Sequence, residues 1–77
     1  MDINMTDVTL HIDENTNKGE RESLRDSLLS IEGVMAADYH DEKPHLMIVE
    51  YNPSAVSSSD FLSKVKSKGL HAELIGL

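Results

Sequence analysis

The order in which two hydrophobic periods follow one another constrains the fold of this chain more than any other feature. In residues 7–13, apolar and polar side chains alternate, which is the pattern of a half-buried β-strand. In residues 18–31, apolar side chains recur at the spacing of one face of a helix. Two further strand patterns, a second helical pattern and a last strand pattern complete the order strand, helix, strand, strand, helix, strand.

Turn and capping residues separate these segments. Gly33 is expected to end the first helix, because glycine adopts a left-handed conformation without a Cβ clash. The residues "DEKP" at 41–44 have a turn composition, so the strand patterns on either side are interpreted as a hairpin. Ser57 and Asp60 are suited to cap the second helix, and Gly69 is suited to end it.

This order of elements matches the split βαβ, or ferredoxin-like, unit. The predicted fold class is therefore α+β, a βαββαβ sandwich. Two helices cover one face of a four-stranded antiparallel sheet, and the first and third strands are central. Residues 1–6 show no periodicity and are expected to be disordered, whereas residues 7–77 are expected to form a single domain.

Charge and composition narrow the classes of function. Fourteen acidic and seven basic side chains give a net charge of -7, so nucleic acid is not expected as a partner. There is no signal peptide pattern and no apolar run of the ~20 residues that a membrane span needs. We therefore expect a cytoplasmic protein without membrane contact. No catalytic Ser-His-Asp spacing and no phosphate-binding loop is evident, so we do not expect an enzyme.

Three stretches of the sequence resemble the heavy-metal-associated domain of copper chaperones and metal-transporting ATPases. They are "LLSIEGV" at 28–34, "VEYNP" at 49–53, and the second helix where it runs into Gly69. The resemblance extends from Val8 to Leu74 and implies the same ferredoxin-like fold. It also implies where a metal would bind, because the family holds its metal with a Cys-x-x-Cys in the loop between the first strand and the first helix.

The corresponding positions, counted back from Gly33, are Asn17 and Glu20, and the chain contains no cysteine. Thiolates are soft ligands that suit copper(I), whereas an amide and a carboxylate are hard and cannot replace them. Copper(I) transfer by the family's usual mechanism is therefore expected to be absent. The same two residues fit a capping box, so the loop is interpreted as the start of a helix that holds no ligand.

Four histidines leave a different metal chemistry open. The predicted fold brings them to one edge of the domain, with four nearby carboxylates; these residues are His11, His40, His45 and His71, and Asp13, Glu14, Asp41 and Glu42. Imidazole and carboxylate ligands suit zinc, nickel or cobalt, and zinc needs three or four of them converging. One hypothesis is a site built on His11 and His71, which could face each other, with one of the other two histidines. The other is ordinary surface histidines that respond to mild acid.

The face of the sheet that no helix covers is a second candidate surface. By alternation, Leu46, Ile48 and Ile75 point away from the helices, whereas Leu74 points toward them. A partly apolar sheet face or an open strand edge is suited to a protein partner or a second copy of the chain.

The predicted function is that of a degenerate heavy-metal-associated-like domain acting as a small protein-interaction or self-association module. No cofactor is expected on this interpretation. The alternative is a protein that binds or carries divalent zinc, nickel or cobalt through histidine and carboxylate. A regulatory domain that senses an amino acid between subunits is a third possibility, which one sequence does not test.

Overall fold

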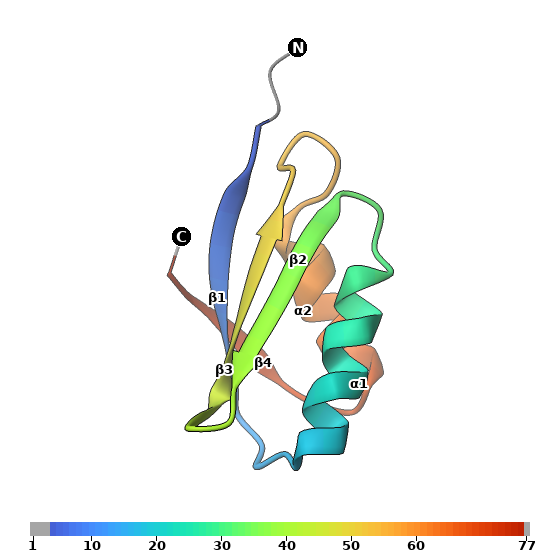
Figure 1. Ribbon diagram of the computed structural model, residues 1–77. Helices are drawn as coiled ribbons and strands as arrows, with labels where there is room; N and C mark the ends of the chain where they lie inside the picture. The colour runs from blue at the N-terminus through green and yellow to red at the C-terminus, as the bar shows by residue number, and fades with distance from the viewer. Residues whose placement is uncertain (1–3, 77) are drawn as a thin grey trace.

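The structure, a computed structural model, describes residues 4–76 (Figure 1). Its elements follow the order that the hydrophobic periods predict. They are β1 (Thr6–Ile12), α1 (Lys18–Leu29), β2 (Val34–His40), β3 (Lys43–Tyr51), α2 (Ser58–Ser67) and β4 (Ala72–Gly76). Neither helix in this part of the chain is long and apolar enough to cross a membrane.

The four strands form one antiparallel sheet in the order β2-β3-β1-β4, which places β1 and β3 in the centre as predicted. β1 and β3 pair without interruption from Thr6 opposite Tyr51 to His11 opposite Leu46. Both helices lie on the same face of the sheet (Figure 1). The predicted α+β, ferredoxin-like sandwich is confirmed, and one sheet face is left without a helix.

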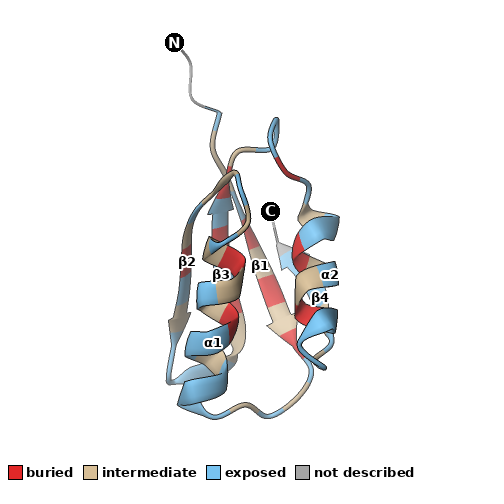
Figure 2. Ribbon diagram, turned by 90° about the vertical axis from the view of Figure 1, so that its right-hand side faces the viewer, coloured by how far each residue is buried: buried red, intermediate tan, exposed pale blue. Residues whose placement is uncertain are grey.

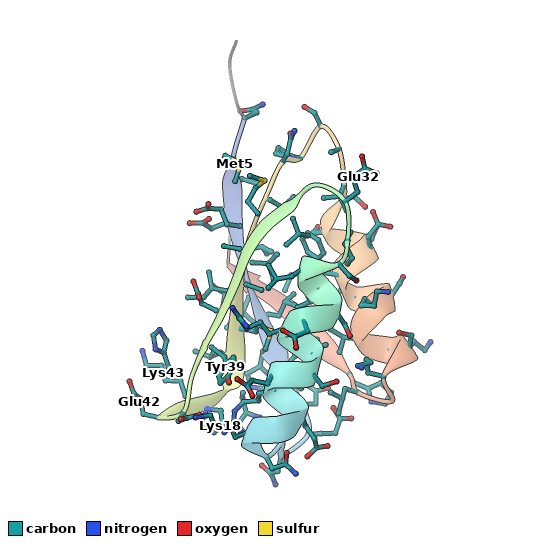
Figure 3. The ribbon with its side chains drawn as sticks, turned by 45° about the vertical axis from the view of Figure 1, so that its right-hand side comes forward. Met5, Lys18, Glu32, Tyr39, Glu42 and Lys43 are labelled. Carbon is teal, nitrogen blue, oxygen red and sulfur yellow. The ribbon has the colours of Figure 1, made fainter. Side chains whose placement is uncertain are left out.

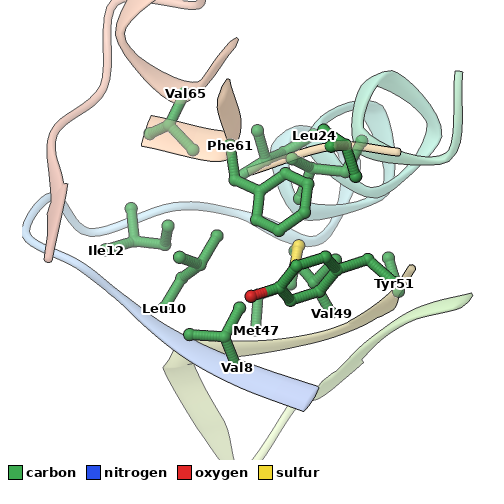
Figure 4. Close-up of a cluster of buried hydrophobic side chains, with 12 residues drawn as sticks. Val8, Leu10, Ile12, Leu24, Met47, Val49, Tyr51, Phe61 and Val65 are labelled. Carbon is green, nitrogen blue, oxygen red and sulfur yellow. The ribbon is translucent and has the colours of Figure 1, made fainter. Parts of the chain in front are cut away.

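The hydrophobic core lies between the sheet and the two helices. In Figure 2, buried bands run along β1 and β3 and along the sides that α1 and α2 turn toward each other. Figure 4 shows the centre of this core, where the ring of Phe61 stands edge-on to that of Tyr51 with centroids 4.8 Å apart. Edge-to-face packing of this kind stabilises an aromatic pair beyond the burial of its area. Met47 is 2% exposed and also belongs to this core.

The predicted helix boundaries are largely confirmed. Gly33 and Gly69 both adopt positive φ, at 98° and 81°. A Cβ at Gly33 would also lie 2.9 Å from the side chain of Ala55, so this position has no room for a larger residue. The first helix ends at Leu29, two residues before the predicted end. Ile31 donates its N–H to Leu28, three residues back, so the chain tightens there into a turn.

Two strand boundaries differ from the prediction: β1 is shifted by one residue, and β3 is longer than the turn residues predict. β1 already begins at Thr6, the last residue of the segment expected to be disordered, and residues 1–3 of that segment lie outside the described residues. Lys43 and Pro44 belong to β3, so the hairpin turn is only residues 41–42. Pro44 is tolerated in this central strand because the pairing of β1 with β3 stops at Leu46, before it reaches the proline.

Candidate functional site

The loop between β1 and α1 is organised as a helix cap. The Asn17 side-chain oxygen accepts from the N–H of Glu20 at 2.8 Å, and the Glu20 carboxylate accepts from the N–H of Asn17 at 3.0 Å. This is the predicted capping box. Asn17 and Glu20 correspond to the cysteine positions that the family resemblance implies. Both side chains already accept hydrogen bonds from main-chain N–H groups at the start of α1.

Arg21, the residue after the capping box, ties this loop to the hairpin. Its guanidinium donates to the main-chain oxygen and the hydroxyl of Thr16, and pairs with Asp41 at 3.3 Å. It also lies 5.9 Å from the ring centroid of Tyr39, within the range of a cation–π contact. Figure 3 shows Tyr39 and Lys18 at this end of the molecule, and Lys18 is 3.9 Å from the same Asp41 carboxylate. Two cations therefore stand beside the loop.

An open cavity of about 410 Å³ adjoins the loop. Its lining residues come from the start of α1 and from the connection between α2 and β4: Asn17, Gly19, Glu20, Ser23, Leu24, Lys68 and Leu70. Lys68 donates to the Ser23 hydroxyl at 3.0 Å and so links the two helices. The polar side-chain groups of this lining are an amide, a carboxylate, a hydroxyl and an ammonium. None of them is a soft ligand of the kind that copper(I) prefers.

The histidines lie at the end of the molecule where the sequence predicts them, but they do not form one cluster. His11 and His45 stack, with ring centroids 5.4 Å apart and planes 11° apart. His45 donates from Nδ1 to the carbonyl oxygen of Ile12 at 2.6 Å, and His11 Nδ1 lies 3.4 Å from the Asp13 carboxylate. His40 is exposed at the end of β2.

His71 makes a separate contact with Glu14. The β1–β4 register places Glu73, not His71, opposite His11, so the expected pairing of the two histidines does not form. The ring Nδ1 and the main-chain N–H of His71 instead donate to the Glu14 carboxylate at 2.6 and 2.8 Å. These hydrogen bonds, the side-chain one foremost, lower the pKa of Glu14 below its ordinary value of 4.5. Among residues 4–76, no three His, Cys, Asp or Glu side chains converge as a metal site.

The uncovered face of the sheet carries apolar side chains of β3. Ile48 is 39% exposed and Leu46 is partly buried, and Ile75 of the edge strand β4 is 53% exposed. Ile48 lies opposite Thr9 on one side and Asp38 on the other, so it stands in the middle of the sheet. We call Leu46 and Ile48 the apolar centre of this face; Ile75, in the edge strand β4, has no register partner in β1 that fixes its side.

Leu74 lies on the expected side of the sheet, because it is opposite the buried Leu10, but it is 38% exposed. β4 is an edge strand with an irregular register, because Leu10 pairs with Leu74 and Thr9 pairs with Gly76. Ile75 is therefore an extra residue in the strand, and a bulge of this kind bends an edge strand and disturbs strict alternation.

Sequence reasoning missed the contacts of Arg21 and the cavity beside the loop. The partner of Arg21 across the loop is Asp41, 20 residues away. The cavity likewise joins the start of α1 to residues after α2. No local pattern in the sequence predicts either the contacts of Arg21 or the cavity.

Comparison with known proteins finds likeness in structure rather than in sequence. No family model matches the chain, and no curated protein matches it. The N-terminal domain of a potential copper-translocating P-type ATPase from Bacillus subtilis, solved in the Cu(I)-loaded state, is 28% identical with a TM-score of 0.85. That match covers 94% of this chain and 89% of the other.

Two further solved structures share the fold at lower identity. A putative copper-ion-binding protein from Bacillus anthracis strain Ames is 15% identical with a TM-score of 0.84, and the match covers 94% of this chain and 100% of the other. Oxidised MerP from Ralstonia metallidurans CH34 is 17% identical with a TM-score of 0.83, with coverage of 91% and 96%. This chain therefore has the fold of the heavy-metal-associated domains, and it has that fold without the Cys-x-x-Cys metal site.

Proposed function

We propose that this chain is a small protein-interaction module that binds through the uncovered face of its sheet and is not an enzyme. The observation that carries the proposal is the exposure of Ile48 in the middle of a sheet face that no helix covers. Burying such side chains against a partner stabilises a complex, because apolar area is removed from water at roughly 25 cal/mol per Å². Exposed apolar groups that lie together on one surface are typical of interaction sites.

The module does not act as a thiolate copper(I) carrier. Solved structures that share its fold include a putative copper-ion-binding protein and the N-terminal domain of a potential copper-translocating P-type ATPase. The positions that the resemblance assigns to the metal carry an amide and a carboxylate, both engaged in the helix cap. What the fold supports here is a scaffold that presents a surface, because copper(I) needs the soft ligands that this chain lacks.

The experiment that tests the proposal compares Ile48→Glu with Ser63→Glu. Both variants add one carboxylate, but Ser63 is an exposed residue of α2 on the helix side. We expect binding to partners isolated from its source cells to be lost in Ile48→Glu and retained in Ser63→Glu, and a concentration series of the purified protein measures whether a second copy binds by the same face. Equal behaviour of the two variants would rule out the uncovered face as the binding surface.

A second candidate function, divalent metal binding, is favoured by one specific contact. His45 donates a hydrogen bond from Nδ1 to the main-chain oxygen of Ile12. The lone pair of its Nε2 is therefore available to coordinate a metal ion. Histidine ligands of metals are commonly oriented by such a bond from the other ring nitrogen. His11, stacked on His45, is the nearest second imidazole. Such a site would take zinc, nickel or cobalt with further ligands from water, the exposed His40 or a partner.

A further inference from the structure

Four carboxylates surround the apolar centre of the uncovered face. The strand registers place Asp7 directly opposite Glu50 and Asp38 directly opposite Ile48. Glu73 lies opposite His11 at the other end of the face. All four of these carboxylate residues are exposed, and none of them forms an ion pair within residues 4–76.

The basic residues lie on the other side of the molecule. Of the seven Lys and Arg residues, only Lys43 lies in a strand, and it stands at the hairpin end of β3. The other six lie in the helices or directly after α2: Lys18, Arg21, Arg25, Lys64, Lys66 and Lys68. The separation of charge is uneven: the helices carry both cations and acidic residues, whereas the uncovered face carries four carboxylates that form no ion pair within residues 4–76.

This separation decides between the occupants of the face. Like charges on directly opposed strand positions, such as Asp7 and Glu50, repel each other. A second copy docked by the same face would add its own four carboxylates to this set, and the two chains would each bring a net charge of -7. Charges in contact lie closer than the Debye length of about 8 Å at physiological salt, so solvent ions screen this repulsion only in part.

We propose that the occupant of this face is a protein surface in which Lys and Arg side chains surround a small apolar cluster, and not a second copy of this chain. The inference rests on the proposed function and names the chemistry of its partner. The apolar centre would be covered by the partner's apolar cluster, while the carboxylates would pair with the surrounding cations. Interfaces commonly have such an apolar centre and polar rim, and complementary charge selects the partner and speeds its association.

The chain itself supplies a defined probe of this chemistry. A face-reversed copy with Asp7→Lys, Glu50→Lys and Glu73→Lys keeps the apolar centre and Asp38, and replaces the other three carboxylates with cations. The matched control is a copy with Glu22→Lys, Asp26→Lys and Glu32→Lys, which changes the net charge equally at exposed positions away from the uncovered face. The amide NMR spectrum of each copy is first compared with that of the wild type, to establish that it is folded.

Each copy is titrated into isotope-labelled wild type, and the amide shifts are followed by NMR. We expect the face-reversed copy to shift amides of β1, β3 and β4, with an affinity that falls roughly tenfold or more when salt is raised from low to above physiological concentration. The control copy should bind at least roughly tenfold more weakly. If the face-reversed copy is unfolded, Glu50→Lys replaces it, with Glu22→Lys as its control.

Three outcomes would overturn the inference. Equal binding of the face-reversed and control copies would assign the effect to net charge alone. Failure of the face-reversed copy to bind would show that cations around the apolar centre are not the partner chemistry. Self-association of the wild type that Ile48→Glu abolishes would make a second copy the occupant, and it would leave the proposed function standing. The proposed function itself fails separately, if Ile48→Glu in the wild type does not weaken any of these associations.

Discussion

At the scale of single residues, the contact between Glu14 and His71 is expected to make the stability of the fold depend on pH. The His71 ring and main-chain N–H both donate to the Glu14 carboxylate and lower its pKa below 4.5. A carboxyl whose folded-state pKa is lowered contributes stability above its unfolded-state pKa, and that contribution is lost as the pH falls through the folded-state pKa. Because the pair is exposed, we expect a small effect with a definite direction.

Glu14→Gln tests this direction. The wild type should have the higher free energy of unfolding above pH 4.5, and the difference between the two proteins should shrink as the pH falls further. Denaturant titrations at several pH values measure it. Glu42→Gln, at the exposed hairpin turn, is the control for loss of one surface charge. A difference between wild type and Glu14→Gln that is constant with pH would mean that the carboxylate's charge is not what stabilises the contact.

At the scale of elements, the start of α1 is the feature that the loop residues explain best. Asn17 and Glu20 satisfy two helix N–H groups that would otherwise lack partners. We expect Asn17→Ala to lower the free energy of unfolding by about 1 kcal/mol, because it removes an N-cap acceptor. Asn15→Ala, an exposed residue of the same loop, should change it by less than about 0.5 kcal/mol. Equal effects in thermal or denaturant unfolding would contradict the capping role.

At the scale of the whole molecule, sharing a fold with other proteins does not determine which ion this chain can bind. The backbone matches three solved structures, among them the Cu(I)-loaded domain from Bacillus subtilis, with TM-scores of 0.83 to 0.85, yet the chain has no cysteine. A backbone positions side chains, but the hardness of their donor atoms selects the ion. On the proposed function, the same scaffold presents a binding surface in place of a thiolate metal site.

Metal titrations followed by NMR test this separation on the complete chain. We expect no tight, stoichiometric uptake of copper(I), because the loop offers only hard donors. If the second candidate function holds, zinc(II) should shift the His11 and His45 resonances together, and His45→Ala should abolish the shift while His71→Ala preserves it. Stoichiometric copper(I) binding would contradict the assignment of the loop as a helix cap. Unchanged histidine resonances in zinc would remove the second candidate.

The sequence alone determined the elements and most of their boundaries. Alternation in residues 7–13, the cap at Asn17 and the positive φ of Gly33 all depend on neighbours within a few positions, which the sequence displays directly. The absence of a thiolate site needed only the residue types.

Only the tertiary structure decided which distant groups meet. The register of β1 and β4 set Glu73 opposite His11, and folding brought Arg21 to Asp41 across 20 residues. It also placed four carboxylates on the uncovered face of the sheet, and six of the seven Lys and Arg residues in the helices or directly after α2. The physical reason is that a one-residue shift in register moves every side chain of a strand to the opposite face, so cross-strand neighbours depend on packing that no local pattern encodes.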